Sequence, residues 1–530
     1  MQPYALTIDK FLDHAAKWSG MQEVVALASD QRVERIGYAA LRERSNRLSG
    51  ALLSLGLAFG DRVATLAWNT PHHLEFYYAT MAAGWVCHTL NPRYAVDNLV
   101  AIINEAEDRA LAVASSLTPV LGELLPRCPT IRHVIVMDGD LPDGVSLDGL
   151  PAKAWLHDAL LEQRGSAVPW GMFDEETPAG LCYTSGTMGA PKGVLYTHRS
   201  NYLHTVHAQQ ADVFGLKRRD AILAAVPMFH ANGWGLPFIA PAAGAKLVLP
   251  GSHLDGASLT KLMRDEGVTV AVGVQTVWQG VIDHLDEVGG DLPALERIVI
   301  GGSDCPETLI RRMGVRLGAR VQRSWGMTEL SPLGTIASPH DAYCPRASGR
   351  PPLGVDLKLV DARGEALPQQ RGGLGHLRAR GASVIDRYYT IDASALDDEG
   401  YLDTGDLASI DVDGNVTIRG RSKDLIKSGG EWINPAKIEE IIGRHPAVAL
   451  VAVVGRPDEK WGERPVLVVE PLPGMTLDAE ALLACLPGKV PRWWVPDAVE
   501  IVGTMPLAAT GKIDKRQLRA QYGGADVDGE

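Results

Sequence analysis

Apolar positions along the chain follow two spacings, one typical of helices and one typical of buried strands. Leu41, Leu48, Leu52 and Leu55 lie mostly at helical spacing, and Gly56 after them predicts the end of a helix. Short apolar runs predict strands at 62–67, 267–274 and 297–300, with helical spacing again at 277–285. Strands that alternate with helices indicate an α/β fold whose sheets are largely parallel and covered by helices.

The pattern changes beyond Gly420. Asn434 followed by Pro435 predicts a helix start, because asparagine caps free N–H groups and proline fits the first helical position. Strand-like runs follow at 448–454 and 465–469, which makes a compact α+β unit of about 100 residues. We therefore predict a large N-terminal domain of layered α/β subdomains at 1–420 and a small α+β domain at 421–530.

Composition and charge narrow the classes of function. Hydrophobic residues make up 46% of the 530 residues and charged residues 22%, as in ordinary globular proteins. The net charge is −13 and no long Lys/Arg run occurs, which argues against nucleic-acid and anionic-membrane partners. Because the protein as a whole is negatively charged, any anionic ligand must be held by nearby positive or hydrogen-bond-donating groups.

The cysteines and the most apolar segments bear on location. The six cysteines include no Cys-x-x-Cys pair, so neither a zinc site nor a disulfide scaffold is predicted, and a reducing cytosol suits them. Charged residues within the first 20 positions leave no apolar stretch for a signal peptide. Prolines 227, 237 and 241 interrupt the apolar segment 221–250, which predicts buried strands and turns rather than a membrane helix. We expect a cytoplasmic protein with no integral membrane segment.

A segment rich in glycine and hydroxyl groups follows the strand-like run 181–183. It reads Thr184-Ser185-Gly186-Thr187-Met188-Gly189-Ala190-Pro191-Lys192-Gly193. Backbone N–H groups approach a polyphosphate closely where no Cβ is present, and hydroxyls and an ammonium complete such a site. A Gly/Ser turn alone would predict only a flexible loop, but the lysine and the length of the string favour phosphate binding. The segment is not a Walker A loop, because no Gly-Lys-Ser/Thr ending occurs.

This string resembles the signature of the AMP-forming adenylating enzymes, the superfamily of acyl-CoA synthetases, peptide-synthetase adenylation domains and firefly luciferase. Four further segments resemble the other motifs of that superfamily, in the same order over nearly the whole chain. They are Trp325 to Glu329, Tyr401 to Asp406, Gly420 to Asp424 and Pro506 to Lys512. The resemblance implies that the small C-terminal domain is mobile. It also implies an enzyme that activates a carboxylic acid with ATP and then transfers the acyl group to coenzyme A.

The resemblance assigns a nucleotide site to the motif residues. Trp325 would offer a flat face to adenine, although a tryptophan is more often simply core. Thr328 would contact the α-phosphate, and Asp406 would accept hydrogen bonds from both ribose hydroxyls. The residues implied for ATP and AMP are Thr184, Ser185, Gly186, Thr187, Gly189, Lys192, Gly302, Ser303, Asp304, Trp325, Gly326, Met327, Thr328, Asp406, Ile418, Arg421 and Lys512.

Carboxylate adenylation brings two anions together, and the resemblance implies the groups that offset their repulsion. Lys512 would contact both the carboxylate and the α-phosphate during this first step. Mg²⁺ would enter with ATP and be held by Glu329 and Thr187, because a hard cation prefers oxygen ligands. The implied catalytic set is Lys512, Glu329, Thr328 and His230. Met188 stands where threonine is usual, which removes one hydroxyl from the phosphate loop.

Further segments are implied to bind the acid and coenzyme A. The acyl contacts would be His230, Trp234, Gly301 and Pro332. A loop of small and aromatic residues would let the pantetheine arm pass close to the backbone, and it consists of Ser428, Gly429, Gly430, Glu431 and Trp432. Lys423 would be the hinge about which the small domain rotates between the two half-reactions.

The choice of acid stays open. Ala231 stands where amino-acid-activating relatives typically have aspartate, and an unpaired buried ammonium is costly, so amino acids are disfavoured. The segments 230–235 and 429–433 look most like those of bacterial short- and medium-chain fatty acyl-CoA ligases and of 3-methylmercaptopropionate-CoA ligases. A hydrophobic slot separates a thioether from a methylene by only about 1–3 kcal/mol. Small aryl acids, loading of a carrier protein and a homodimer all remain open. His198, His204 and His207 are interpreted as core or surface residues.

Overall fold

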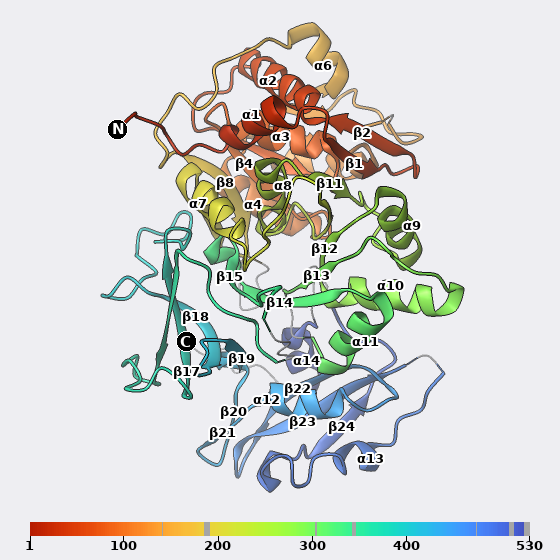
Figure 1. Ribbon diagram of the computed structural model, residues 1–530, viewed down its shortest axis with the longest axis vertical. Coiled ribbons are helices and arrows are strands. Elements are labelled where there is room, and N and C mark those ends of the chain that lie inside the picture. Colours follow the sequence, from red (N-terminus) through yellow and green to blue (C-terminus); the bar gives the residue numbers. More distant parts are fainter. Residues whose placement is uncertain are drawn as a thin grey trace.

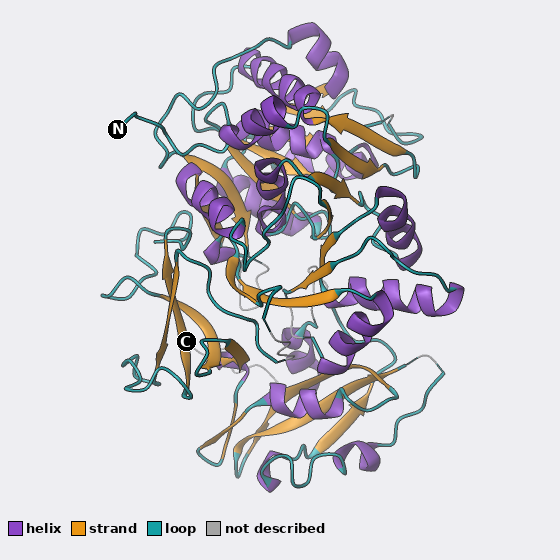
Figure 2. Cartoon of the chain, in the orientation of Figure 1, coloured by secondary structure: helices purple, strands orange, loops and turns teal. Residues whose placement is uncertain are grey.

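The computed structural model describes residues 1–139, 141–184, 191–302, 305–341, 346–472, 474–507 and 513–523. Within these ranges the strands form four sheets, with most helices packed on the first two (Figures 1 and 2). A mixed α/β architecture was predicted from the alternating pattern, and it is confirmed. In the described residues, no helix is long and apolar enough to cross a membrane.

The first sheet has seven strands in the order β7-β6-β5-β3-β4-β8-β9 and is parallel except for β9. All five residues of β4 are buried, as expected for a strand with helices on both faces. The strands are β3 (Arg62–Leu66), β4 (Val86–Leu90), β5 (Ala110–Val113), β6 (His133–Val136), β7 (Lys153–Leu156), β8 (Pro178–Tyr183) and β9 (Gly193–Thr197). The helices of this part include α2 (Tyr38–Ser54), which precedes β3, and α3 (Pro71–Met81), α4 (Val96–Ala106), α5 (Leu121–Leu124) and α6 (His157–Arg164).

The second sheet has eight strands in the order β15-β14-β13-β12-β10-β11-β1-β2, with antiparallel strands only at its two edges. They are β1 (Glu23–Leu27), β2 (Val33–Gly37), β10 (Ala221–Ala225), β11 (Lys246–Leu249), β12 (Val270–Gly273), β13 (Arg297–Ile300), β14 (Arg320–Gly326) and β15 (Leu333–Ile336). The helices of this part are α1 (Asp9–Trp18), α7 (His198–Ala208), α8 (Leu236–Ala243), α9 (Gly256–Glu266), α10 (Gln275–Val288) and α11 (Glu307–Leu317).

The segment 221–250 contains a helix that the sequence did not predict. Strands and turns alone were expected there, but α8 lies between β10 and β11 and is largely buried. Pro237 occupies the first turn, where a missing N–H costs nothing, and Gly244 ends the helix in the left-handed conformation. The expectation was wrong because Pro237 stands at the helix start, where proline is tolerated, and the short helix also accommodates Pro241 in its interior.

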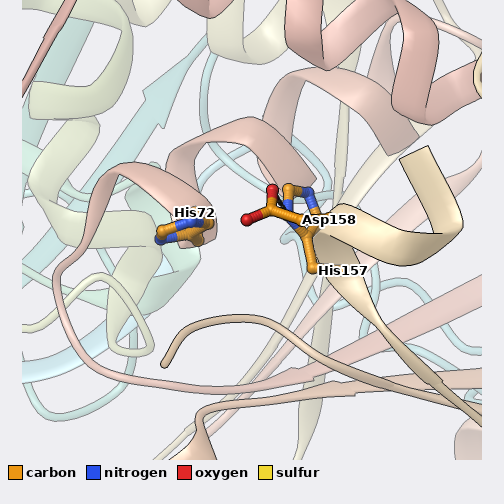
Figure 3. Close-up of side chains that lie close together, drawn as sticks. All are labelled: His72, His157 and Asp158. Carbon is orange, nitrogen blue, oxygen red and sulfur yellow. Dashed lines mark ion pairs between the residues drawn. The ribbon is translucent and has the colours of Figure 1, made fainter. Parts of the chain in front are cut away.

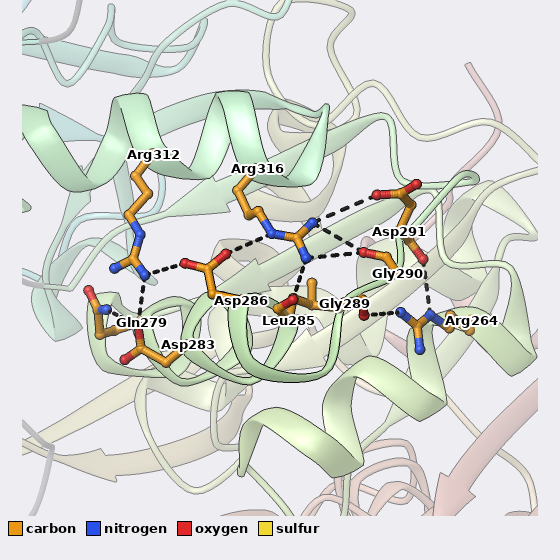
Figure 4. Close-up of polar contacts among 10 residues, drawn as sticks. All are labelled: Arg264, Gln279, Asp283, Leu285, Asp286, Gly289, Gly290, Asp291, Arg312 and Arg316. Atoms are coloured by element: carbon orange, nitrogen blue, oxygen red, sulfur yellow. Dashed lines mark hydrogen bonds and ion pairs between the residues drawn. The ribbon is translucent and has the colours of Figure 1, made fainter.

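Helices α10 and α11 are joined by a network of ion pairs (Figure 4). Arg312 contacts Asp283 at 3.0 Å and Asp286 at 2.6 Å, and Arg316 contacts the other oxygen of Asp286 at 2.8 Å. Arg316 also donates to the carbonyl of Gly290 at 3.1 Å. Single exposed pairs contribute little, but two guanidinium groups that share one carboxylate fix the direction of α11. That helix leads directly into β14, which carries the Trp325 motif.

The third and fourth sheets lie beyond β15. The third is an antiparallel sheet of β16 (Val355–Val360), β17 (Leu374–Gly381), β18 (Leu402–Ile410) and β19 (Val416–Arg421). The fourth consists of β20 (Ile426–Ser428), β21 (Glu431–Ile433), β22 (Val448–Asp458), β23 (Gly462–Pro471) and β24 (Ala498–Ile501). It is accompanied by α12 (Pro435–Ile442), α13 (Ala479–Leu483) and α14 (Lys515–Tyr522), and the unit lies at the lower end of the molecule in Figure 1.

The C-terminal unit has hydrophobic cores of its own. Two buried clusters consist only of residues from Ile426 onward, whereas the other clusters draw on the preceding chain. Its first helix begins as predicted, because Asn434 accepts a hydrogen bond from the N–H of Ala436 at 3.0 Å and Pro435 occupies the first turn. A large N-terminal part followed by a small C-terminal domain is therefore confirmed.

Candidate active site

Asp406 and its neighbours form one end of the candidate site. Asp406 lies on β18 and is only 3% exposed. Its Oδ2 accepts a hydrogen bond from the indole N–H of Trp325 at 2.8 Å, and its Oδ1 lies 2.9 Å from Nε of Arg421. Arg421 also donates to the carbonyl of Thr404 at 2.8 Å. The structure thus brings together three residues that the motifs assigned to the nucleotide, and it fixes the direction of the carboxylate.

The indole of Trp325 is mostly enclosed by protein. It is 9% exposed and belongs to the hydrophobic cluster formed by the third sheet and strands β8 and β9. Ile418, on β19, and Met327 pack against the same cluster. The N–H contact with Asp406 was not predicted from the sequence. Trp325 therefore holds the carboxylate in place, and its stacking on adenine stays a prediction.

Glu329 and Thr328 lie in a short 3-10 helix, Thr328–Leu330, directly after β14. Both are 8% exposed, and Oε1 of Glu329 accepts a hydrogen bond from the Tyr388 hydroxyl at 2.9 Å. Burial, together with the charge of Glu329, raises the pKa of Tyr388, so its phenol stays a donor. The Lys192 ammonium lies 4.7 Å from the centre of the same ring. Tyr388 was not singled out by sequence reasoning, yet it joins a proposed phosphate ligand to a proposed metal ligand.

The phosphate segment is closed at its base by the antiparallel pair β8 and β9. The N–H of Thr184 donates to the carbonyl of Lys192 at 2.9 Å, and the N–H of Lys192 donates to the Thr184 hydroxyl at 3.0 Å. The two described ends of the segment therefore meet beside Tyr388. Other predicted site residues lie outside the described residues, and they are Ser185, Gly186, Thr187, Gly189, Ser303, Asp304 and Lys512.

The predicted acyl segment forms a left-handed turn. Every residue from Ala231 to Gly235 has a positive φ, between 40° and 74°, although three of the five are not glycine. This conformation is unfavourable for residues with a Cβ, so neighbouring groups must hold it. The N–H of Ala231 lies 3.2 Å from Sγ of Cys182, and His230, half-buried, precedes the turn. Cys182 was not predicted as a site residue, and its contact is between β8 and a segment 49 residues away.

The turn places Trp234 against the end of β13. A Cβ on Gly301 would lie 3.1 Å from the Trp234 ring, and one on Gly302 would lie 3.3 Å from it. Glycine at both positions lets the indole approach the backbone closely. The carbonyl of Pro332 accepts a hydrogen bond from the N–H of Met327 at 2.9 Å. The structure therefore brings Trp234 to Gly301 and Pro332 to the nucleotide motif, and their contact with the acid stays a prediction.

The three histidines set aside in the sequence are structural where they are buried. His204 is 3% exposed, and its Nε2 accepts the N–H of Leu333 at 3.3 Å. Its ring also lies against Gly235, at the end of the left-handed turn. Burial lowers the pKa of His204 and of His198 to about 3 in each case, so both stay neutral near pH 7. His204 thereby supports the acyl turn and β15 at once.

Lys423 lies between residues that are anchored in opposite directions. The Ser422 hydroxyl lies 2.9 Å from Nδ1 of His376, on β17 of the third sheet. Asp424 forms ion pairs with Arg519 and, at 3.9 Å, with Lys515, both on the last helix. Lys423 itself is exposed. The residue before Lys423 is therefore bound to the third sheet and the residue after it to the C-terminal unit, as expected for a hinge at Lys423.

Four of the five residues predicted to bind pantetheine, Gly429 to Trp432, are exposed in this structure, whereas Ser428 is buried. Gly429 and Gly430 both have positive φ, and the N–H of Gly429 donates to the carbonyl of Trp461 at 2.7 Å. Ser428 accepts a hydrogen bond from Arg464 at 3.2 Å, and Trp432 is 52% exposed. These bonds fix the loop to its own domain. The structure does not bring it to the residues around Asp406 and Glu329.

Comparison with known families identifies the chain over most of its length. The family of AMP-binding enzymes matches residues 11–389, and the C-terminal domain of AMP-binding enzymes matches residues 437–512. The chain is 42% identical over 532 residues to the 3-methylmercaptopropionyl-CoA ligase of Ruegeria lacuscaerulensis, covering 98% of both chains. It is 41% identical over 529 residues to the medium-chain-fatty-acid–CoA ligase of Ectopseudomonas oleovorans, covering 98% of this chain and 96% of the relative.

Solved structures show the same fold. The anthranilate CoA ligase AuaEII in complex with anthranoyl-AMP matches with a TM-score of 0.87 at 23% identity, over 98% of both chains. The o-succinylbenzoate coenzyme A synthetase of Bacillus subtilis, in complex with ATP and magnesium ion, matches with a TM-score of 0.81 at 23% identity, over 96% of this chain and 99% of that one. The two family matches and the relatives at 41–42% identity show that the chain belongs to the AMP-binding enzyme family.

Proposed function

We propose that this protein is an acid–coenzyme A ligase that makes an acyl-adenylate from a short- or medium-chain acid and transfers the acyl group to coenzyme A. The observation that carries the proposal is the contact of Trp234 with Gly301 and Gly302, at the carboxyl end of β13. An apolar ring there, in a turn without a charged side chain, suits an apolar acid. The names of relatives at 41–42% identity, a 3-methylmercaptopropionyl-CoA ligase and a medium-chain-fatty-acid–CoA ligase, support the same choice.

The residues are proposed to act in the following way in the first half-reaction. Asp406, held by Trp325 and Arg421, orients the ribose of the nucleotide. Lys512 offsets the repulsion between the acid carboxylate and the α-phosphate as the new C–O–P linkage forms and pyrophosphate leaves. His230 and Trp234 orient the acid beside Gly301.

Mg²⁺ is proposed to accompany ATP. Glu329 fits this ion, because one of its carboxylate oxygens is oriented by Tyr388 and a carboxylate is a preferred ligand of a hard cation. The ion would supply charge neutralisation at the phosphates. Thr187, the second proposed ligand, lies outside the described residues.

In the second half-reaction the thiol of coenzyme A attacks the acyl-adenylate carbonyl, the thioester forms and AMP leaves. We propose that the boundary between the domains falls at 420/421 and that the C-terminal domain, mobile about Lys423, brings Ser428 to Trp432 to the site for this step. The separate cores of the C-terminal unit support such a rigid-body motion. A cytoplasmic location and a homodimer are proposed as well, the latter to be tested by sedimentation.

The experiment that tests the function measures the two half-reactions separately. ATP–pyrophosphate exchange is measured with acids from butyrate to octanoate, 3-methylmercaptopropionate, a small aryl acid and amino acids. Formation of acyl-CoA from coenzyme A is then followed by chromatography. We expect exchange and thioester formation with the first two groups. Exchange without thioester would favour loading of a carrier protein, and exchange with amino acids alone would contradict the proposal.

A further inference from the structure

A cluster of two histidines and an aspartate lies at the upper end of the molecule, away from the candidate active site (Figures 1 and 3). His72 is in the first turn of α3, and His157 and Asp158 are the first two residues of α6. One potential ligand atom of each residue lies within 4.8 Å of those of the other two. Figure 3 shows the Asp158 carboxylate between the two rings. Residues far apart in the sequence thus place two imidazoles and a carboxylate together.

A buried imidazole nitrogen of this cluster, Nδ1 of His72, has no hydrogen-bond partner. His157 is 2% exposed, and its two ring nitrogens face the carboxylates of Glu75 and Asp158. The two rings are nearly perpendicular, at 89°, with centres 5.3 Å apart. A buried polar atom without a partner is costly, so Nδ1 of His72 indicates a ligand.

The distance between His157 and Asp158 matches the distance between two ligands of one metal ion. Its Nδ1 lies 3.4 Å from Oδ1 of Asp158, which is longer than a normal N–H···O hydrogen bond. Zn²⁺ binds imidazole nitrogen and carboxylate oxygen at about 2.0–2.2 Å, so neighbouring ligands of a tetrahedral site are roughly 3.3–3.5 Å apart. Its Nε2 lies 3.0 Å from Oε2 of Glu75. A carboxylate on the second nitrogen is the usual companion of a metal-binding histidine.

The charges of the side chains around the cluster are compatible with a bound cation. Arg44 lies 2.6 Å from Glu75 and 2.9 Å from Asp158, so one guanidinium faces two carboxylates. The two carboxylates exceed the charge of Arg44 by one, and either a proton on His157 or a bound cation offsets that charge. The Asp158 side chain is 72% exposed, which gives an ion access from solvent.

We propose that His72, His157 and Asp158 bind a divalent transition-metal ion, best matched by Zn²⁺, with Glu75 and Arg44 orienting the ligands. Three protein ligands of nitrogen and oxygen suit Zn²⁺ and leave a fourth position for water. The ion links the first turn of α3 to the first turn of α6. The site is distinct from the Mg²⁺ proposed at Glu329, and it does not take part in the ligase reaction.

The test is calorimetric titration of the full-length, chelator-treated protein with ZnCl₂ in millimolar Mg²⁺, which occupies sites made of oxygen ligands. We expect one Zn²⁺ per chain, and a rise in melting temperature when it binds. His72→Gln and Asp158→Asn should weaken binding at least tenfold. His14→Gln and Asp148→Asn, at exposed positions, are the matched controls and should bind as the parent does.

Two outcomes would overturn the proposal. One is the absence of saturable Zn²⁺ binding in the parent protein, and the other is equal binding in the cluster variants and the controls. Asp158→Asn keeps the shape of a mostly exposed side chain, so loss of binding there is not explained by unfolding. Melting curves without zinc verify that point for each variant.

Discussion

The hydroxyl of Tyr388 donates a hydrogen bond to Oε1 of Glu329 at 2.9 Å, while the Lys192 ammonium lies over the same phenol ring at 4.7 Å. One tyrosine thus connects the lysine that ends the phosphate segment to the carboxylate of the Thr-Glu motif. We infer that Tyr388 holds Glu329 ready for a magnesium ion.

Tyr388→Phe should therefore weaken the first half-reaction without unfolding the protein. Loss of a hydrogen bond to a charged group costs about 1.5–3 kcal/mol when buried, so a decrease of roughly tenfold or more in kcat/KM for adenylation is expected. The Mg²⁺ concentration needed for half-maximal rate should rise as well. Tyr389→Phe is the control, since the described contact of Tyr389 with Gly193 is made by its backbone N–H. Equal effects in both variants would contradict the role of Tyr388.

Lys512→Ala should slow adenylation by roughly 10²–10³-fold, the scale for one preorganised electrostatic donor. Conversion of supplied acyl-AMP to acyl-CoA should be largely spared, because Lys512 is proposed to act only in the first step. The two half-reactions are compared by pyrophosphate exchange and by thioester formation. Equal losses in both would show that the assignment to the first step is wrong.

Lys423→Pro should block the change of domain orientation. Proline fixes φ at the one residue between Ser422, bound to His376, and Asp424, paired with Arg519. Acyl-AMP should then accumulate while coenzyme A is not acylated. Lys423→Ala, which removes the same side chain but leaves φ free, should turn over normally. Normal thioester formation by the proline variant would rule out rotation at this residue.

Trp234→Ala should change the chain-length preference. Removing the indole beside Gly301 opens space that a longer acid can fill and a short acid cannot. Each buried methylene contributes about 0.8 kcal/mol, so two or three could shift preference by one to two orders of magnitude. We expect a lower kcat/KM for butyrate and an unchanged or higher one for octanoate. A uniform loss for all acids that follows a lower melting temperature would make Trp234 an ordinary core residue.

Acid should destabilise the fold through its buried neutral histidines. Burial lowers the pKa of His204 from 6.5 to about 3, so protonation favours the unfolded chain. Its contribution is fully present above pH 6.5 and is lost progressively as the pH falls from 6.5 toward 3. Between pH 6.5 and 5, this one group should remove about 1.5–2 kcal/mol. The free energy of urea unfolding should depend less on pH in His204→Gln than in the parent. In His14→Gln, a change at an exposed position, it should depend on pH as much as in the parent.

Features set by neighbouring residues could be predicted from the sequence. The start of α12 follows from Asn434 and Pro435, and the position of β13 follows from a short apolar run before two glycines. Capping and strand burial depend on nearby residues, so the sequence carries them directly. The same holds for the five motifs, whose order along the chain indicated the family.

Contacts between distant segments could not be predicted in this way. The Trp325–Asp406 bond joins residues 81 apart, and the Tyr388–Glu329 bond joins residues 59 apart. Both depend on how the third sheet packs on β14, which no local pattern encodes. The left-handed turn at 231–235 was missed for a related reason. Its two glycines indicate a bend, but the conformation of Ala231 and Trp234 depends on support from Cys182 and His204.

The anchoring of Ser422 and Asp424 on opposite partners also limits how far the predicted pantetheine loop at 428–432 can move from the rest of the chain. Only Lys423 lies between the two anchored residues, so the linker is very short. The C-terminal unit can therefore change its orientation but not its distance from the third sheet. Under the proposed rotation, the loop at 428–432 would be supplied to the site at a high effective concentration that does not depend on enzyme dilution. A C-terminal fragment added separately would have to reach millimolar concentrations, roughly those of a short tether, to replace it.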